Sequence, residues 1–492
     1  MDAGISLILA VVFGLFFYTF NTPLGPSVGS DNGIYLTMGT AIANGYAPYT
    51  EIFDHKGPLV FVLQAIPQLL AGGYSTLAVF AQQVLFLFAC LYVIDALARQ
   101  LHVRHTVLVQ LAYLVLIAEH IGGGNLTEEY TNLFTLIGLY IVMRVFDAEA
   151  KPRKDSAYLL PAAMLGVMTM LCVLVRANNA LPLCGVVAVL SAALLLEKRF
   201  KALGYCAAGM AVGCAAAALP VVLWLAWHGA LSAAVYGALI HNMMYAETAG
   251  ASRVWMLLHS SYGHWALLMA ALSCLGALAL FIRSKRIALP LAIVAGAAMG
   301  GLAAFISHKY YLHYLILGAP VAALGVALML ERLQRLVCCG RQKRAAIGLG
   351  VMLVLLLTMY GAKANTGRIQ AVKAEGSFQQ DARDLYALVP EEDHDSFMAY
   401  RVEPKWYVYT KALPCMRFYF LQEILADADP AVMDEIVAEF ESDPPKWLVI
   451  YYNREFGPPY DARVAAIFEN DYAFVDAKGQ YQLLRLKEDG DA

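Results

Sequence analysis

The sequence predicts a polytopic α-helical membrane protein with about eleven transmembrane helices, followed by a C-terminal extracytoplasmic α/β domain. Three observations support this fold class. The 492 residues are 60% hydrophobic and 15% charged, and the mean hydropathy is +0.59. Uncharged stretches of about 20 residues, long enough to cross a bilayer, recur in the first 360 residues. Charged residues then spread through 363–492, where no stretch is long enough to span.

The predicted spans begin with the apolar stretch 5–20, which has no Lys or Arg before it and no clear small-residue cleavage site after it. We therefore interpret it as a span and not as a signal peptide. The shorter stretch 58–70 is predicted as a re-entrant or interfacial helix. The other spans are predicted at 77–98, 105–120, 129–147, 157–175, 179–196, 203–227, 264–282, 287–306, 312–331 and 345–362.

Basic residues are distributed unevenly among the connections. One alternating set of loops holds sixteen Lys and Arg residues, whereas the other holds only Lys56, Arg176, Arg253 and Lys309. Because Lys and Arg are retained in cytoplasmic loops, the second set is predicted to be extracytoplasmic. The N-terminus is then cytoplasmic, and the C-terminal domain lies outside.

The domain boundaries follow from these patterns. Residues 1–362 are predicted as a membrane domain with a first extracytoplasmic loop at 21–76, and residues 363–492 as the α/β domain. Strands in that domain are expected at 397–400, 447–452 and 481–486, with helices near 430–441 and 460–469.

Composition also excludes several classes of partner. The net charge of −3 does not indicate nucleic acid. The nine cysteines have no C-x-x-C spacing and are interpreted as packing residues. No cofactor is predicted. A divalent metal stays an open alternative that no D-x-D or H-x-x-x-H spacing supports.

The first loop carries the strongest chemical signal. Ionisable residues beside a bilayer core are costly and tend to be functional. Asp31 follows the first span, and the segment 34–44 after it is predicted to form an amphipathic helix along the membrane surface. A carboxylate at that level can accept a proton from a hydroxyl group, although a helix cap or a solvated loop residue is the alternative.

Lys56 precedes Gly57 and Pro58, which open an apolar helix. An ammonium group beside the free amides of a helix start can bind phosphate. The alternative is a lysine that only extends to the membrane interface. The neighbouring Asp54 and His55 are predicted to orient Lys56, to act as a second acid–base pair or to bind the metal mentioned above.

Other predicted outer loops are consistent with one polar cavity. Arg176 lies in a very short turn and needs an anionic partner. The aromatic and His residues have a simpler alternative role at the membrane interface. The residues predicted to bind substrate are Tyr35, Tyr49, Asp54, His55, Glu128, Glu129, His308, Tyr311 and His313.

The first loop resembles that of the C-type (GT-C) glycosyltransferases, in the bacterial branch of protein O-mannosyltransferases and aminoarabinose transferases. The resemblance rests on Asp31, on the stretch Gly45 to Tyr49 and on Lys56-Gly57-Pro58. The segment His308 to Tyr314 before Pro320 is similar to another element of this family, as is the stretch Asn453 to Phe456 after a strand.

This resemblance implies a bacterial membrane transferase that moves a hexosyl or pentosyl group from a polyprenyl-phosphate donor to an envelope glycan, lipid or protein. It implies that Asp31 activates the acceptor and that Lys56 holds the donor phosphate. From chemistry alone, Arg176 and Lys309 are added as phosphate-binding cations. The alternatives are a transporter or a lipid-linked-sugar flippase, and a membrane-anchored ligand sensor.

Overall fold

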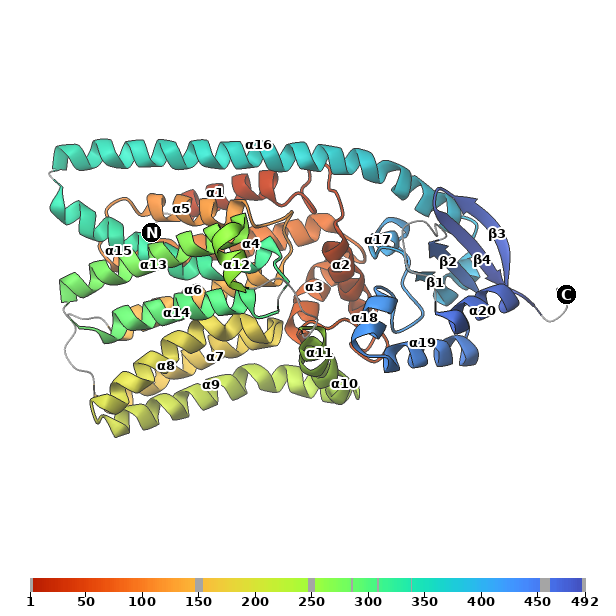
Figure 1. Ribbon diagram of the computed structural model, residues 1–492, viewed down its shortest axis with the longest axis horizontal. Helices are drawn as coiled ribbons and strands as arrows, with labels where there is room; N and C mark the ends of the chain where they lie inside the picture. The colour runs from red at the N-terminus through yellow and green to blue at the C-terminus, as the bar shows by residue number, and fades with distance from the viewer. Residues whose placement is uncertain are drawn as a thin grey trace. The chain divides into compact units, whose positions relative to one another are not determined.

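The computed structural model describes residues 3–146, 154–246, 253–284, 286–307, 309–337, 339–451 and 461–488 (Figure 1). The chain separates into two compact units. We call the first the bundle unit; it comprises Met1–Thr22, Phe80–Trp224 and Ala246–Thr366. We call the second the loop-tail unit; it comprises Pro23–Val79, Leu225–Tyr245 and Gly367–Ala492.

The bundle unit is built from long apolar helices. Eight helical segments within the described ranges are long and apolar enough to cross a membrane. Three further helices, α1, α5 and α6, lie at the other three predicted spans; α1 and α5 are shorter, α6 carries three charged side chains, and their crossing of the membrane stays a prediction. The predicted multi-pass helical membrane protein is thereby confirmed. The helices are α1 (Ala3–Phe17), α4 (Thr76–Gln100), α5 (Thr106–Ala118), α6 (Thr127–Val145), η1 (Asp155–Tyr158), α7 (Leu159–Val175), η2 (Ala177–Ala180), α8 (Leu181–Leu196), α9 (Phe200–Trp227), α12 (Arg253–His259), α13 (Ser261–Ser284), α14 (Ala288–Phe305), η4 (Leu312–Gly318), α15 (Ala319–Leu336) and α16 (Cys339–Tyr386).

Small residues allow these helices to approach closely. A Cβ atom added to Gly276 of α13 would lie 2.3 Å from the Cα of Gly325 in α15. One added to Gly185 of α8 would lie 2.7 Å from the carbonyl oxygen of Ala295 in α14. Such contacts are typical of membrane helices, which pack backbone against backbone because lipid provides no hydrophobic drive between them.

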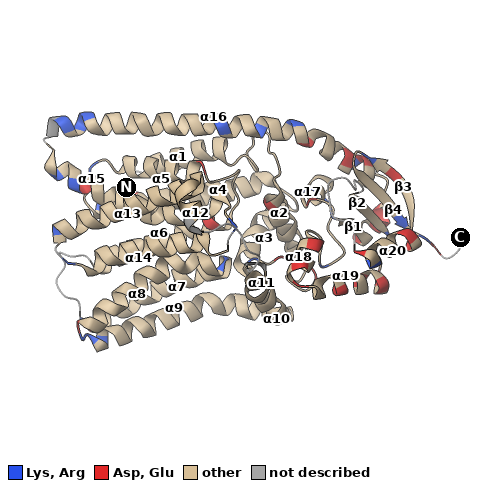
Figure 2. Cartoon of the chain, in the orientation of Figure 1, with Lys and Arg blue, Asp and Glu red and all other residues tan. Residues whose placement is uncertain are grey.

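Basic residues of the bundle unit gather at one end of its helices. Figure 2 shows them where α8 meets α9 and where α15 meets α16. These connections belong to the set that the charge distribution predicts to be cytoplasmic. The orientation in the membrane stays a prediction.

The loop-tail unit combines the first loop, a short middle segment and the C-terminal tail. The predicted boundary at residue 362 lies within α16, and residues 23–79, predicted as part of the membrane domain, group with the tail. Its elements, beside the end of α16, are α2 (Ser30–Ala43), α3 (Pro58–Ala71), α10 (Leu231–Val235), η3 (Tyr236–His241), α11 (Asn242–Ala246), η5 (Glu391–Ser396), β1 (Phe397–Tyr400), α17 (Lys405–Thr410), α18 (Gln422–Ala428), α19 (Ala431–Ser442), β2 (Trp447–Tyr451), α20 (Ala462–Asp471), β3 (Tyr472–Lys478) and β4 (Tyr481–Leu486).

A four-stranded sheet of order β1-β2-β4-β3 forms the core of the tail. β1 pairs in parallel with β2, with Phe397 opposite Trp447, and β4 pairs antiparallel with both β2 and β3. The parallel pair needs a crossover, which α17, α18 and α19 provide. The predicted α/β domain is confirmed.

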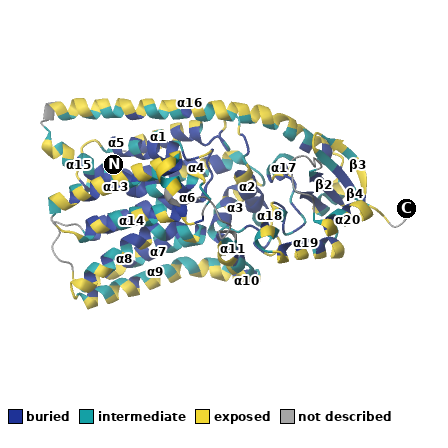
Figure 3. Cartoon of the chain, in the orientation of Figure 1, coloured by how far each residue is buried: buried dark blue, intermediate teal, exposed yellow. Residues whose placement is uncertain are grey.

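The segment 34–44 does not form the amphipathic surface helix that was predicted. Helix α2 is buried on all sides from Asn32 to Ala41 (Figure 3), so the expected amphipathic surface helix is wrong. One side packs on α3, where a Cβ added to Gly39 would lie 2.5 Å from the carbonyl oxygen of Gln64. The tail covers another side, because the Tyr419 hydroxyl donates to the carbonyl of Ile34 at 3.2 Å.

Enlarging Gly33 should separate α2 from the tail. A Cβ atom there would lie 2.7 Å from the backbone nitrogen of Lys405, and a main-chain neighbour cannot rotate away. We expect Gly33→Val to destabilise the protein by about 1–3 kcal/mol, as overpacking does elsewhere. The measurement is the amount of monodisperse protein left after heating in detergent.

The matched control is Gly376→Ala on the exposed part of α16, where an added Cβ meets nothing within 4 Å. This change should leave stability equal or raise it by up to about 1 kcal/mol, because Ala favours helices. Equal heat resistance of the two variants would contradict the close packing of α2 on α17.

Candidate active site

Asp31 lies at the start of helix α2. The helix begins at Ser30 after Gly29, so Asp31 is in its first turn, where a negative charge faces the positive end of the helix dipole. Its side chain is exposed. Tyr35 follows one helical turn later and therefore lies on the same face. The sequence thus presents a solvent-accessible carboxylate above a buried aromatic ring.

A tight turn holds the chain between α2 and α3. Tyr49 adopts a left-handed backbone conformation, with φ of 67°, and its amide donates to the carbonyl of Ile52 at 2.7 Å. The Tyr49 hydroxyl donates to the carbonyl of Lys56 at 2.6 Å. Tyr49 is fully buried, so it fixes the backbone at Lys56, and its contact with substrate stays a prediction.

Asp54 anchors the cationic side chain of the loop. It is completely buried, and the Lys56 ammonium lies 3.4 Å from each of its carboxylate oxygens. The backbone N–H of His55 donates to it at 2.7 Å, and His55 Nδ1 lies 3.1 Å away. These distances are those expected if Asp54 orients the Lys56 side chain, as predicted.

The charges around Asp54 determine its protonation. Burial by itself raises the pKa of the Asp54 carboxyl, but the positive charge of Lys56 and the hydrogen bonds from His55 outweigh burial and hold the pKa below its ordinary value. Asp54 is therefore ionised at neutral pH. Its negative charge keeps Lys56 in place beside the start of α3, which follows at Pro58.

Lys56 also reaches towards helix α2. Its ammonium lies 5.5 Å from the centre of the Tyr35 ring, within range of a cation–π interaction. Tyr35 is one helical turn from Asp31, so the cation contacts the helix whose first turn holds Asp31. Of the two residues predicted to carry the chemistry, Asp31 therefore lies on α2 and Lys56 contacts α2.

The middle segment of the loop-tail unit contacts the same loop. The Asn242 side chain donates to the carbonyl of His55. A Cβ added to Gly237 would lie 3.0 Å from the Tyr49 ring, so this position permits a close approach. The buried ring of His241 lies 6.0 Å from that of His55. No motif in the sequence marks Asn242 or His241 as a site residue.

Arg417 fastens the tail to the first loop. Its Nε donates to the carbonyl of Tyr49 at 2.7 Å, and its own carbonyl accepts from the amide of Phe53 at 3.0 Å. The guanidinium also lies over the Phe53 ring, 5.2 Å from its centre, and pairs with Glu435. No motif marks Arg417 in the sequence, because its role depends on contacts far along the chain.

In the bundle unit, Arg176 lies in an ion pair. Its guanidinium is 3.4 Å from the carboxylate of Glu128, donates to the hydroxyl of Tyr314 at 3.0 Å and lies 4.6 Å from the centre of that ring. The anionic partner that a lone Arg requires is therefore Glu128. Glu129 has a local contact instead, since its carboxylate accepts from the backbone of Leu126 at 3.0 Å and caps α6.

The remaining predicted residues lie before α15. Tyr311 stacks on His313 at 5.6 Å, and His313 packs edge-on against Tyr314 at 4.6 Å. The amide of Lys309 donates to the hydroxyl of Ser307 at 3.4 Å. His308 and the stretch 453–456 lie outside the described residues. Among the residues that are described, no cluster of three His, Cys, Asp or Glu side chains forms a metal site.

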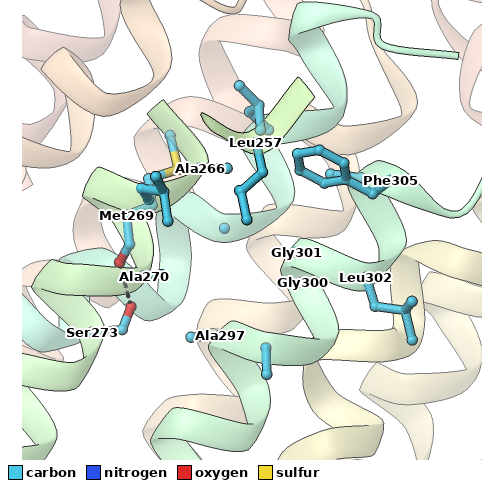
Figure 4. A pocket seen from close by; sticks show the side chains of 15 residues that line it. Leu257, Ala266, Met269, Ala270, Ser273, Ala297, Gly300, Gly301, Leu302 and Phe305 are labelled. Carbon is cyan, nitrogen blue, oxygen red and sulfur yellow. Dashed lines mark hydrogen bonds between the residues drawn. The ribbon is translucent and has the colours of Figure 1, made fainter. Parts of the chain in front are cut away.

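An apolar cavity of about 440 Å³ also lies in the bundle unit, within the usual size range of ligand pockets. Figure 4 shows Leu257, Met269 and Phe305 around it. Its polar side chain, Ser273, donates internally to the carbonyl of Met269 at 2.8 Å. The cavity lies among α12, α13, α14 and η4, so it suits a hydrocarbon chain.

Comparison with known proteins identifies the fold of the chain. No protein-family model matches the chain, and no curated protein sequence matches it significantly. The arrangement of apolar helices and a terminal α/β domain is shared with solved structures, so the predicted resemblance is confirmed at the level of the fold.

Three solved structures have this fold in common with the chain. ArnT from Cupriavidus metallidurans bound to undecaprenyl phosphate is similar with a TM-score of 0.62, 14% identity and 98% of each chain covered. The same protein in its apo state is similar with a TM-score of 0.57 and 12% identity, again with 98% of each chain covered. The third is the oligosaccharyltransferase AglB from Archaeoglobus fulgidus, in complex with an inhibitory peptide and a dolichol-phosphate. Its TM-score is 0.52 and its identity 11%, and the match covers 91% of this chain and 69% of AglB.

Proposed function

We propose that the protein is a membrane glycosyltransferase that moves a sugar from a polyprenyl-phosphate donor to an acceptor of the cell envelope at the extracytoplasmic face. The observation that carries this proposal is the position of Lys56. Buried Asp54 holds the Lys56 ammonium at 3.4 Å, and this ammonium lies over the ring of Tyr35. Tyr35 is one helical turn after Asp31 on α2. An accessible base and a fixed cation are the two groups that this transfer requires.

In the proposed reaction, a hydroxyl of the acceptor attacks the anomeric carbon of the sugar. The hydroxyl proton passes to the Asp31 carboxylate as the new C–O bond forms. The bond between the anomeric carbon and the phosphate oxygen breaks, and the lipid phosphate leaves with the electron pair. Lys56 stabilises the negative charge on that phosphate, and a fixed cation at developing charge is usually the largest catalytic contribution.

Arg176 and Lys309 are the further cations of the proposal. Since Glu128 pairs with Arg176, Arg176 contributes directed N–H donors more than net positive charge. The apolar cavity in the bundle unit supports a donor with a hydrocarbon chain. The solved structures with the same fold, ArnT with undecaprenyl phosphate and AglB with a dolichol-phosphate, support a donor of this lipid class.

The test is turnover by the purified protein in detergent. We expect the wild type to consume one of a panel of undecaprenyl-phosphate sugars carrying a radiolabel in the sugar, with envelope extract as the acceptor. The measurement is the release of undecaprenyl phosphate together with the label that appears in the extract. Heat-denatured protein is the control.

The outcome that contradicts the proposal is an intact donor. A flippase moves the lipid-linked sugar across a membrane but leaves the sugar–phosphate bond unbroken. If monodisperse protein leaves every donor in the panel intact and transports one of them in proteoliposomes, the transferase proposal is wrong.

A further inference from the structure

We propose that His241 binds a hydroxyl of the transferred sugar and so contributes to the choice of donor. The inference rests on the proposed function, because it assigns one more residue to the same donor site. His241 is on η3, in the middle segment of the loop-tail unit, far from the first loop in sequence.

The hydrogen-bonding state of His241 points to a ligand. Its side chain is completely buried, and among the described residues neither ring nitrogen has a hydrogen-bond partner. Buried polar atoms in proteins are nearly always paired, because leaving one unpaired costs stability. Two such atoms on one ring point to a partner outside the described residues, and we infer that this partner is a bound ligand.

The surroundings of the ring define what it faces. Phe53 meets it edge-on at 5.9 Å, the His55 ring lies at 6.0 Å and the Tyr236 ring at 6.0 Å. The Tyr236 hydroxyl donates to Asp429. His55 directly precedes Lys56, so His241 lies beside the residues proposed to hold the donor phosphate.

The local backbone conformation positions the His241 ring. Residues Tyr236–His241 form a π-helical turn, a rare conformation that is frequent at functional sites. Gly237 permits the turn to pack against Tyr49 and Phe53, with an added Cβ at 3.0 and 3.1 Å from their rings. Asn242 then bonds the carbonyl of His55. Three contacts thus fix one segment against the first loop.

The chemistry of the ring matches a sugar hydroxyl better than a phosphate. Burial, together with nearby His55, lowers the pKa of His241, so the ring is neutral at pH 7. A neutral imidazole offers one N–H donor and one nitrogen acceptor, which complement hydroxyl groups that both donate and accept. A phosphate anion accepts only, and Lys56 already provides a cation for it.

The experiment compares His241→Phe with wild type on the donor that the wild type turns over. We expect KM for that donor to rise about tenfold or more, because the hydroxyl loses its partner. Binding of undecaprenyl phosphate, which has no sugar, should be unchanged. Thermal stability should stay equal or rise, because phenylalanine leaves no unpaired buried nitrogen. His241→Gln keeps a donor and an acceptor, so its KM should lie between those of the wild type and His241→Phe.

Two further variants serve as controls. His394→Phe lies in the same unit, where the His394 ring stacks on Tyr386 at 4.7 Å and contacts the carbonyl of Val389 at 3.2 Å; it should lower stability without changing KM. Lys56→Met should weaken binding of both the donor and undecaprenyl phosphate, because both carry the phosphate.

Several results would overturn the inference. An unchanged KM in His241→Phe excludes a sugar contact. Equal weakening of donor and undecaprenyl phosphate binding assigns the ring to the phosphate or the lipid instead. Failure of the proposed function is recognised separately, because the wild type itself then turns over no lipid-linked sugar, and that result removes the inference as well.

Discussion

Replacing Asp31 by Asn should reduce sugar transfer by about a hundredfold or more, the size expected for loss of a general base. Asparagine keeps the shape of the side chain but cannot take the proton of the acceptor hydroxyl. The fold should survive, because Asp31 is exposed in the first turn of α2 and loss of one charge there costs only about 0.3–1 kcal/mol. The measurement is label transferred to envelope material, with expression and detergent size-exclusion profiles matched.

Glu51→Gln is the matched control for Asp31→Asn. Glu51 is another exposed acid of the first loop, and its carboxylate accepts from the amide of Ala47 at 2.6 Å. The glutamine oxygen can accept the same bond, so transfer should stay within a few-fold of wild type. Equal transfer by wild type and Asp31→Asn would assign Asp31 a structural role and remove the base from the mechanism.

Replacing Lys56 by Met should have a second large effect. Transfer should fall by about a hundredfold to a thousandfold, as when one stabilising donor is removed from an oxyanion site. The change also leaves buried Asp54 without its cation, and breaking a buried ion pair costs about 3–5 kcal/mol. Activity and thermal stability should therefore both decline at pH 7, whereas Lys56→Arg should retain most of the stability.

A double variant separates these two effects. Asp54→Asn combined with Lys56→Met removes both charges, so stability should recover while transfer stays low. The pH dependence provides a second check, because the pKa of Asp54 is lowered in the folded protein. The contribution of the pair is full above the ordinary carboxyl pKa of about 4 and is lost as pH falls below it. Recovery of transfer in the double variant would exclude Lys56 as the phosphate-binding cation.

Much of the fold follows from local sequence patterns. Length and apolarity predict the spans, and short β-rich stretches predict β1, β2 and β4 at nearly the observed residues. The prediction missed β3, because most of Tyr472–Lys478 is exposed and its pairing is interrupted between Phe474 and Asp476. A strand without alternating burial carries no period-two signal.

The surroundings of α2 could not be predicted for a different reason. An apolar helix with polar positions suggests a membrane surface when its partners are unknown. One partner is Tyr419, whose hydroxyl bonds to Ile34 across 385 residues of sequence. A contact at that separation leaves no trace in the local pattern from which the prediction was made.

The candidate site divides in the same way. Asp54, His55 and Lys56 are adjacent in sequence, so their interaction was predictable from chemistry alone. Arg417 and Asn242 reach the same loop from 368 and 187 residues away, and a single sequence contains no sign of either contact. The residues that position the loop are therefore those that sequence reasoning missed.

The loop-tail unit is assembled from segments that lie far apart in the chain, which sets an order of events during biosynthesis. Its first segment ends at Val79 and its last begins at Gly367, so the 287 residues 80–366 are made between them. At about 5–20 residues per second, translation takes roughly 15–60 s to cover that interval. During this time the nascent loop has no tail to cover α2 and no Arg417 to hold the turn at Tyr49. The contacts that Arg417 and Tyr419 make with the first loop can therefore form only after most of the chain has been synthesised.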